Sequence, residues 1–371
     1  MSGIFLTIKE KVTTFFQKKI KISTKHKIDF LDQLWSLLNS WIPLTNSLKI
    51  IRYQTKNKSV QRMIDVILDN TNKWESFQQS AMKFPQIFRQ FDISIIEMWE
   101  VTGKLDVSIE TIKKKEEKAQ ELKTKIIGAL IYPCIIIFLA TAMIVIFMVF
   151  VIPKIQKMYK DSKVNLPALT QVVIKVSEFL QNNVFLLILG CIGLGFLFSF
   201  LKSSPVTRPW FDRFVLRIPL FGSLIKKRIL TTFTSSLGIL LSSGVIINKS
   251  LEISSNSVEN VYYQRAIDVI SEGIKKWEDF SKLLGIDNIQ TGKVSDLFPI
   301  ELASAVKIGE QTWKLPELLI RLSIKFEKEI DVVVKNMQVM IEPLVIVFVG
   351  IIVWTLILAI MLPFFNMVNV I

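Results

Sequence analysis

The sequence predicts an all-α membrane protein with two repeated cytoplasmic helical-bundle domains and three transmembrane helices. Half of the 371 residues are hydrophobic and the mean hydropathy is +0.43, which is high for a water-soluble domain. Three long runs carry no charged residue, and two polar regions of the chain repeat one another. No segment shows the convincing alternation of apolar and polar residues that is typical of strands.

Residues 1–29 form a basic N-terminal segment. Apolar residues such as Ile4 and Ile8 recur there at helical spacing, with lysines such as Lys9 and Lys11 among them. This pattern is typical of an amphipathic helix that lies on an anionic membrane surface. A helix that docks on its own domain has the same pattern, so both interpretations stay open.

Residues 30–125 and 202–338 are predicted to be the first and second cytoplasmic helical domains. Apolar residues in the stretch 30–41 form a stripe at helical spacing. Lysine- and glutamate-rich stretches at 113–121 and 325–331 are typical of solvated helices that lead into the membrane.

Three apolar runs, at 126–152, 184–201 and 339–363, are predicted to be transmembrane helices. About 20 apolar residues are needed to cross the hydrocarbon core, so the second run is near the lower limit. Lysines and arginines gather on the domain side of each run, which places the N-terminus and both domains in the cytoplasm. The loop 153–183 and the tail 364–371 then lie outside, although this loop also carries lysines.

The second polar region repeats the first at two constant offsets. At an offset of 203, the triplet 73–75 (Lys-Trp-Glu) recurs at 276–278. At an offset of 210, Glu100 and Leu105 match Glu310 and Leu315, and the register continues without a gap through the following apolar run. Gene duplication is the economical explanation for agreement of this length.

The residue inventory predicts no catalytic, cofactor-binding or metal site, so the chain is not expected to be an enzyme. His26 is the only histidine, too few imidazoles for the usual zinc sites. Cys134 and Cys191 lie in apolar runs and are interpreted as small packing residues. The segment 285–293 resembles a phosphate-binding loop but has six residues between its glycines instead of four, and Val294 replaces the required Ser or Thr.

The formal charge of +14 indicates an acidic partner, a nucleic acid or an anionic membrane surface. The basic stretches adjoin the apolar runs, and base-stacking aromatic residues are not interleaved with them. Membrane lipid is therefore the predicted partner of these charges, and nucleic acid is not.

Several short motifs resemble the type II secretion F / type IV pilus inner-membrane platform family. Pro219 begins a Pro-x-x-Gly-x-Leu segment after the second apolar run, and Leu-Leu-x-x-Gly-Val follows at 240–245. Gly309-Glu310 precedes a leucine, and a Glu-Pro pair opens the last apolar run. The resemblance covers roughly residues 30–365. The sequence departs from the pattern where Trp313 and Trp41 replace turn glycines and where Tyr132 replaces the glutamate of the Glu-Pro pair.

This resemblance implies a platform that couples a cytoplasmic assembly ATPase to pilin or pseudopilin subunits. Other inner-membrane assembly proteins and a second copy of the chain are further expected partners. A subunit of a membrane transporter or channel is the alternative function, because duplication around membrane helices is common there. The candidate contacts to partners or between domains are Glu100, Gly103, Leu105, Gly222, Gly244, Glu310, Leu315 and Glu342, and the candidate helix-shaping residues are Pro133 and Pro343.

Three of these candidates have an open alternative. For Glu100 and Glu310 the alternative is a structural polar pair or cap inside the bundle. Glu342 lies at the head of the third run, where it is either a functional intramembrane carboxylate or an interfacial one.

Overall fold

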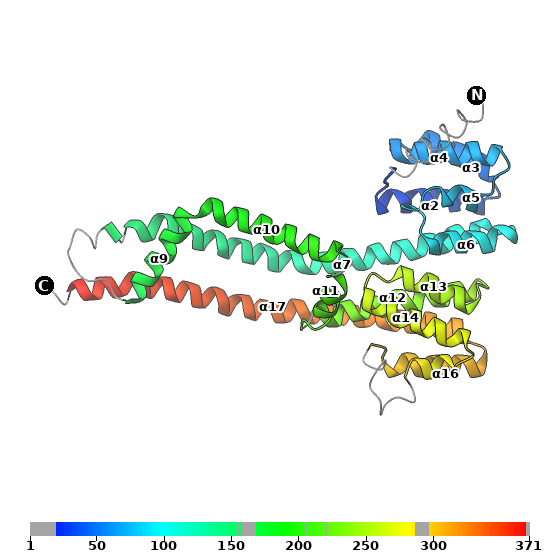
Figure 1. Ribbon diagram of the computed structural model, residues 1–371. Helices are drawn as coiled ribbons and strands as arrows, with labels where there is room; N and C mark the ends of the chain where they lie inside the picture. Colours follow the sequence, from blue (N-terminus) through cyan, green and yellow to red (C-terminus); the bar gives the residue numbers. More distant parts are fainter. Residues whose placement is uncertain are drawn as a thin grey trace, which may run out of the picture. The chain divides into compact units, whose positions relative to one another are not determined.

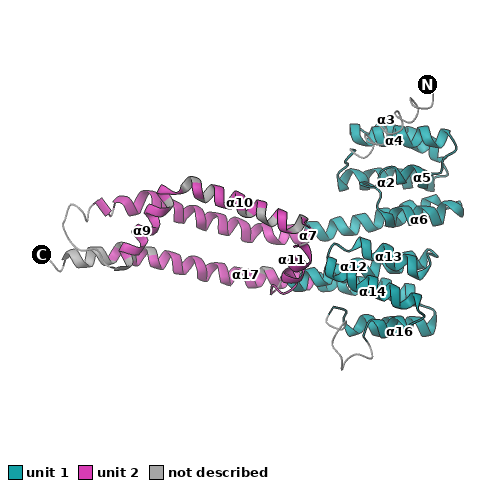
Figure 2. Ribbon diagram, viewed as in Figure 1, with its two compact units in different colours: residues 1–124, 222–330 teal, residues 125–221, 331–371 magenta. Residues whose placement is uncertain are grey.

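The computed structural model describes residues 20–154, 156–157, 168–204, 207–219, 221–285 and 297–368. Within these ranges every regular element is a helix (Figure 1), which confirms the predicted all-α class. The chain divides into two compact units (Figure 2): unit 1 holds residues 1–124 and 222–330, and unit 2 holds 125–221 and 331–371.

Unit 1 contains a first set of six helices, and the first five of them pack in sequence, each on the next along the chain. Ser23 caps the first of them, which begins at Thr24, six residues before the predicted start of the domain at residue 30. Phe30, Leu31 and Leu34 form its buried stripe, as the apolar spacing predicts. The set comprises α2 (Thr24–Asn39), α3 (Leu44–Gln54), α4 (Lys58–Asn72), α5 (Phe77–Met82), α6 (Gln90–Val101) and the first part of α7 (Leu105–Ile146).

A second set of helices in unit 1 follows the same order. Its members are α12 (Phe221–Ser242), α13 (Ile247–Ser257), α14 (Val261–Lys275), α15 (Phe280–Leu283), α16 (Ile300–Thr312) and the first part of α17 (Leu315–Val368). The bounds of α3 and α4 reappear in α13 and α14 at the offset of 203. The caps correspond too, because Asn57 and Asn260 each accept two backbone N–H groups at the start of α4 and α14.

The two sets share apolar packing inside unit 1. Leu240, Val245 and Ile253 of the second set belong to the same buried cluster as the core residues of the first. Helix α6 packs against α13 at this contact. Residues far apart in the sequence are thereby joined in one core, which burial of apolar surface stabilises.

Unit 2 contains the remainder of α7 and α17 together with η1 (Phe147–Val151), α9 (Ala168–Asn182), α10 (Val184–Ser203) and α11 (Arg208–Val215). In the described part of the chain, two helices are long and apolar enough to cross a membrane, Leu105–Lys154 and Leu315–Thr355. The predicted runs at 126–152 and 339–363 fall on these helices. The run at 184–201 falls on α10, whose 20 residues are mostly apolar.

Two features of unit 2 go beyond the sequence prediction. Helix α9 occupies part of the segment predicted as an outer loop. The π-helical turn η1 follows directly on the end of α7. Hydrogen bonds in a π-helix span five residues instead of four, so carbonyl groups in such a turn lose their usual N–H partner four residues further along the chain. The Met148 carbonyl accepts hydrogen bonds from Ser177 Oγ and, at 2.9 Å, from Gln181 Nε2, both on α9.

Three sequence predictions concern residues that the structure describes only in part. The N-terminal segment is described from residue 20 onward, and the phosphate-loop-like segment only at Gly285. Cys134 is a free and exposed cysteine, whereas the side chain of Cys191 lies outside the described residues.

Candidate functional site

Six helices of unit 1 end in turns of one design, which we call the cap turns. In each, the first or second residue beyond the helix end has a positive φ, and the backbone N–H of the next residue donates to a carbonyl five residues back. At Trp74, for example, the Trp74 N–H donates to the Thr71 carbonyl (3.1 Å) and the Glu75 N–H to the Asn70 carbonyl (3.0 Å). The positive-φ residues are Trp41, Trp74 and Gly103 in the first set and Gly244, Trp277 and Trp313 in the second.

Tryptophan is an unusual residue for this position. Glycine is the common choice, because a Cβ atom in the left-handed conformation costs about 1–2 kcal/mol. Among the described residues, the four non-glycine residues with positive φ are all tryptophans, with φ between 59° and 65°. Their side chains are 93–97% exposed, so burial of the indole does not offset the backbone strain.

The cap turns lie together at one end of unit 1, which we call the cap end. Successive helices of each set run back and forth, so alternate turns share an end (Figure 1). Contacts join the turns: the Glu100 carboxylate near the end of α6 accepts the N–H groups of Phe77 (2.6 Å) and Gln78 (2.9 Å) at the start of α5. A Cβ on Gly244 would lie 3.4 Å from Met98 Cε, which joins the first set to the second.

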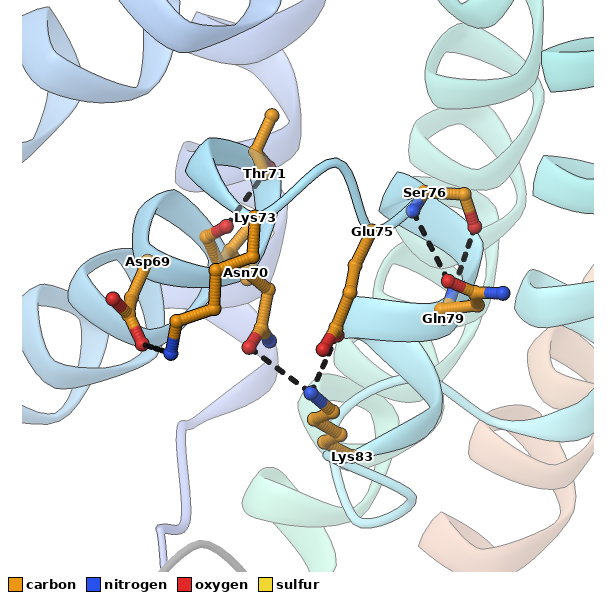
Figure 3. Close-up of polar contacts among 9 residues, drawn as sticks. Asp69, Asn70, Thr71, Lys73, Glu75, Ser76, Gln79 and Lys83 are labelled. Atoms are coloured by element: carbon orange, nitrogen blue, oxygen red, sulfur yellow. Dashed lines mark hydrogen bonds and ion pairs between the residues drawn. The ribbon is translucent and has the colours of Figure 1, made fainter.

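Polar contacts hold the turn between α4 and α5 in place (Figure 3). Lys83 Nζ bonds Asn70 Oδ1 at 3.0 Å and Glu75 Oε2 at 2.6 Å, so it ties the two sides of the turn together. Ser76 and Gln79 form a reciprocal capping box at the start of α5. The geometry of this turn is therefore fixed by groups other than the indole of Trp74.

The two repeated glutamates both act as helix caps. Glu310 Oε1 accepts the Phe280 N–H at 3.2 Å, as Glu100 does twice in the first set. A carboxylate at a helix N-terminus satisfies free N–H groups and interacts favourably with the helix dipole. The geometry thus favours the structural alternative for these two carboxylates, and a contact to a partner stays a prediction.

The other predicted residues of unit 1 lie at buried or partly buried positions near helix ends. Leu105, the first residue of α7, packs partly buried against the core. A Cβ on Gly309 would lie only 2.7 Å from Leu315 Cα, so this glycine allows the end of α16 to approach the start of α17. Gly222 is buried in the first turn of α12.

The predicted residues of the apolar helices lie inside continuous helices. Pro133 falls within α7 and Pro343 within α17, so neither proline begins or ends a helix. Glu342 is exposed on α17. Whether it acts as a functional or an interfacial carboxylate stays a prediction.

The sequence interpretation missed a buried charge cluster in the first set. Lys27 Nζ lies 2.7 Å from a carboxylate oxygen of Asp92 and 2.7 Å from one of Glu116. Burial alone would lower the pKa of Lys27, but the two carboxylates outweigh this effect and the pKa is raised. The sequence does contain a signal for this burial, because Lys27 lies at helical spacing from Leu31 and Leu34 and so falls on the apolar face of α2.

Lys115 lies next to this cluster, with its Nζ 3.0 Å from the centroid of the Phe91 ring. Its surroundings are poor in water, and this desolvation lowers the pKa of Lys115 to about 7 despite the nearby Asp92 and Glu116. Within the described residues, no group of three or more His, Cys, Asp or Glu side chains could hold a metal ion.

Comparison with known proteins agrees with the resemblance seen in the sequence. The chain is 28% identical over 343 residues to the type IV pilus assembly protein PilC of Pseudomonas aeruginosa, covering 92% of this chain and 90% of that protein. PilC of Thermus thermophilus is 28% identical over 340 residues, with coverages of 92% and 82%. The type II secretion system protein F of Pseudomonas aeruginosa is 25% identical over 337 residues, with coverages of 90% and 81%.

The profile of one protein family matches the chain twice, over residues 30–153 and 233–363. The family is described as type II secretion system (T2SS), protein F. The two matched ranges begin in α2 and α12, and together they cover more than half of the sequence. The chain belongs to the type II secretion system protein F family.

Proposed function

We propose that this protein is the inner-membrane platform of a type IV pilus or type II secretion assembly machine. In this role it couples a cytoplasmic assembly ATPase to the insertion of pilin-like subunits into a growing fibre. The observation that carries the proposal is the family match over both halves, with relatives named for pilus assembly and for type II secretion. The two helices long and apolar enough to cross a membrane support it.

The proposed topology has three spans, with the N-terminus and both helical domains in the cytoplasm and the C-terminus outside. The apolar parts of α7, α10 and α17 would be the spans, and lysines and arginines flank each on the domain side. An odd number of spans with one outer hairpin is consistent with two domains on one side.

The proposed coupling runs along α7 and α17. Each begins at the cap end of unit 1 and continues without interruption into an apolar stretch. Where the two helices enter unit 2, Lys125 Nζ lies 3.3 Å from a carboxylate oxygen of Asp331, so the pair links one helix to the other. A movement of the cap turns would be transmitted along these two helices. Gly103 and Leu105 stand at the first junction, so substituting either in a stably inserted protein should impair fibre assembly.

A pull-down from crosslinked native cells tests the proposal. The full-length protein, solubilised in detergent, serves as bait. Recovery of the assembly ATPase with pilin-like subunits, and loss of surface fibres in a deletion strain, are the expected results. Recovery of neither partner by a folded bait would contradict the platform role. Substrate flux through vesicles that contain the purified protein would then support the transporter-subunit alternative.

A further inference from the structure

The fold does not require tryptophan at the cap turns. At the repeat offsets, Trp41 matches Gly244 and Trp313 matches Gly103. Both members of each pair have a positive φ, so glycine makes the same turn in one half that tryptophan makes in the other. Strained backbone residues are retained mainly where they serve function. The reason for these indoles therefore lies outside the packing of unit 1.

The four indoles project into solvent. Trp41, Trp74, Trp277 and Trp313 are 95%, 97%, 95% and 93% exposed. Val101 and Ile246, which lie close to Gly103 and Gly244 in the sequence, are also exposed and add apolar surface to the cap end. Tryptophan is among the residues most enriched at the energetic centres of protein–protein interfaces. A group of exposed indoles on short, hydrogen-bonded turns is thus typical of a docking surface.

The repetition of these turns indicates a partner with several identical binding pockets. The same Lys-Trp-Glu triplet is displayed at 73–75 and again at 276–278, in turns of the same geometry. Exposed Lys104 and Lys314 follow the third turn of each set. A partner that engages both copies needs the same pocket more than once, which an oligomer of identical subunits provides. The lysines favour acidic groups around each pocket.

The cap end lies far along α7 from the residue where this helix leaves unit 1. From Leu105 at the cap end, α7 runs to the boundary of unit 1 at Thr124. At 1.5 Å per residue this stretch is about 30 Å long. The cap end therefore lies at the end of unit 1 opposite to the one where α7 leaves for its apolar stretch.

From these observations we infer that the tryptophans of the cap turns dock the protein onto the assembly ATPase. The inference rests on the proposed function and names the surface that performs it. Each indole inserts into an acidic-rimmed apolar pocket of one ATPase subunit, and equivalent turns of the two sets engage different subunits.

Binding of the purified ATPase from the same cells to the full-length protein in nanodiscs tests the inference. Four single variants carry Trp41→Gly, Trp74→Gly, Trp277→Gly or Trp313→Gly, and a combined variant carries all four substitutions. We expect the combined variant to lose affinity by about tenfold or more, with smaller losses for the single variants. Thermal stability should stay equal or rise, because glycine suits the positive φ.

Two matched controls remove exposed aromatic side chains elsewhere. The first is Tyr53→Ala, at an exposed residue on the last turn of α3, away from the cap end. The second is Trp210→Ala, at an exposed residue on α11. Both should bind the ATPase like the unchanged protein. If the combined variant fails to fold, the ATPase affinity of the single variants Trp41→Gly and Trp313→Gly tests the inference instead. These two are expected to fold, because the equivalent turn in the other half of the chain already has glycine.

The outcomes separate the inference from the proposed function. Unchanged affinity of the folded combined variant, with normal binding by the natural protein, would overturn the docking surface and leave the platform role intact. A change of oligomeric state with unchanged ATPase affinity would assign the surface to a second copy instead. Absence of ATPase binding by the natural protein would contradict both proposals.

Discussion

Lys27 and Asp92 form a buried ion pair in the first set of helices at the place where two leucines lie in the second. The Lys27 ammonium is 2.7 Å from the Asp92 carboxylate, and both side chains are almost fully buried. At the repeat offsets, Leu230 and Leu302 stand in their place, and Phe326 matches Glu116, the third member of the cluster. All three apolar counterparts are buried. One fold therefore accommodates a charged cluster in one half and an apolar one in the other.

This relationship predicts how the cluster responds to substitution. Lys27→Leu should destabilise the protein by about 3–5 kcal/mol, because two carboxylates then lose their buried cation. The triple variant Lys27→Leu, Asp92→Leu and Glu116→Phe should recover most of that loss, since well-packed apolar residues often replace a buried ion pair without destabilisation. Thermal unfolding of the purified protein in detergent, followed by circular dichroism, measures both. A triple variant as unstable as Lys27→Leu would contradict the prediction.

The lowered pKa of Lys115 predicts a pH-dependent stability difference. Between about pH 7 and the unfolded-state pKa near 10.4, the unfolded chain keeps a proton that the folded protein has released. The contribution of Lys115 to the free energy of unfolding therefore rises with pH between these two values. The melting temperature of the natural protein, minus that of Lys115→Met, should increase from pH 6 to pH 9.

Lys325 provides the matched control for that experiment. It matches Lys115 at the offset of 210, but its side chain is 50% exposed and its Nζ lies 3.1 Å from Glu301. The corresponding difference for Lys325→Met is measured over the same pH range for comparison. A flat curve for Lys115→Met would show that the ammonium of Lys115 is well solvated.

Gly238 is predicted to be intolerant of a methyl group. A Cβ at this position would lie 2.9 Å from Ile320 Cγ1 and 3.1 Å from the Pro316 carbonyl oxygen, so α12 and α17 would have to separate. Gly238→Ala should lower stability by about 1–3 kcal/mol. Gly128→Ala is the control, because a Cβ there meets nothing within 4 Å and alanine favours helix. Equal melting temperatures for the two variants would refute the close contact.

The helix caps predict an order of effects. Glu100 accepts two backbone N–H groups of α5 and Glu310 one of α15. Glu100→Ala should cost about 1.5–3 kcal/mol of stability, and Glu310→Ala less. Glu100→Gln should fall between Glu100→Ala and the natural protein, since one oxygen remains to accept. The same thermal unfolding assay measures the three variants, and a larger effect for Glu310→Ala would reverse the assigned roles.

Much of the helical architecture follows from the sequence, because its signals are local. Apolar spacing predicts the buried stripe of α2, and uncharged runs predict the long apolar stretches of α7 and α17. The duplication transfers helix bounds from one set to the other, as α4 and α14 show.

Other features depend on contacts that no local pattern encodes. The sequence singles out Trp41 and Trp313 as departures from glycine, yet side-chain chemistry gives no reason to expect tryptophan at positive φ. Lys27 is charged and belongs to the basic N-terminal segment at 1–29. Its burial depends on Asp92 and Glu116, which lie 65 and 89 residues away along the chain. The π-helical turn η1 likewise involves α9, a helix from the segment predicted as a loop.

Site-specific photocrosslinking in living cells tests the central claim most directly, that one chain links a cytoplasmic ATPase to pilin-like subunits in the membrane. A photoreactive residue replaces Lys276 at the cap end in one strain and Phe348, exposed on α17, in another. The platform account predicts that position 276 captures the ATPase and position 348 captures a pilin-like subunit. Capture of the same partner at both positions, or of neither by a correctly inserted protein, would contradict it.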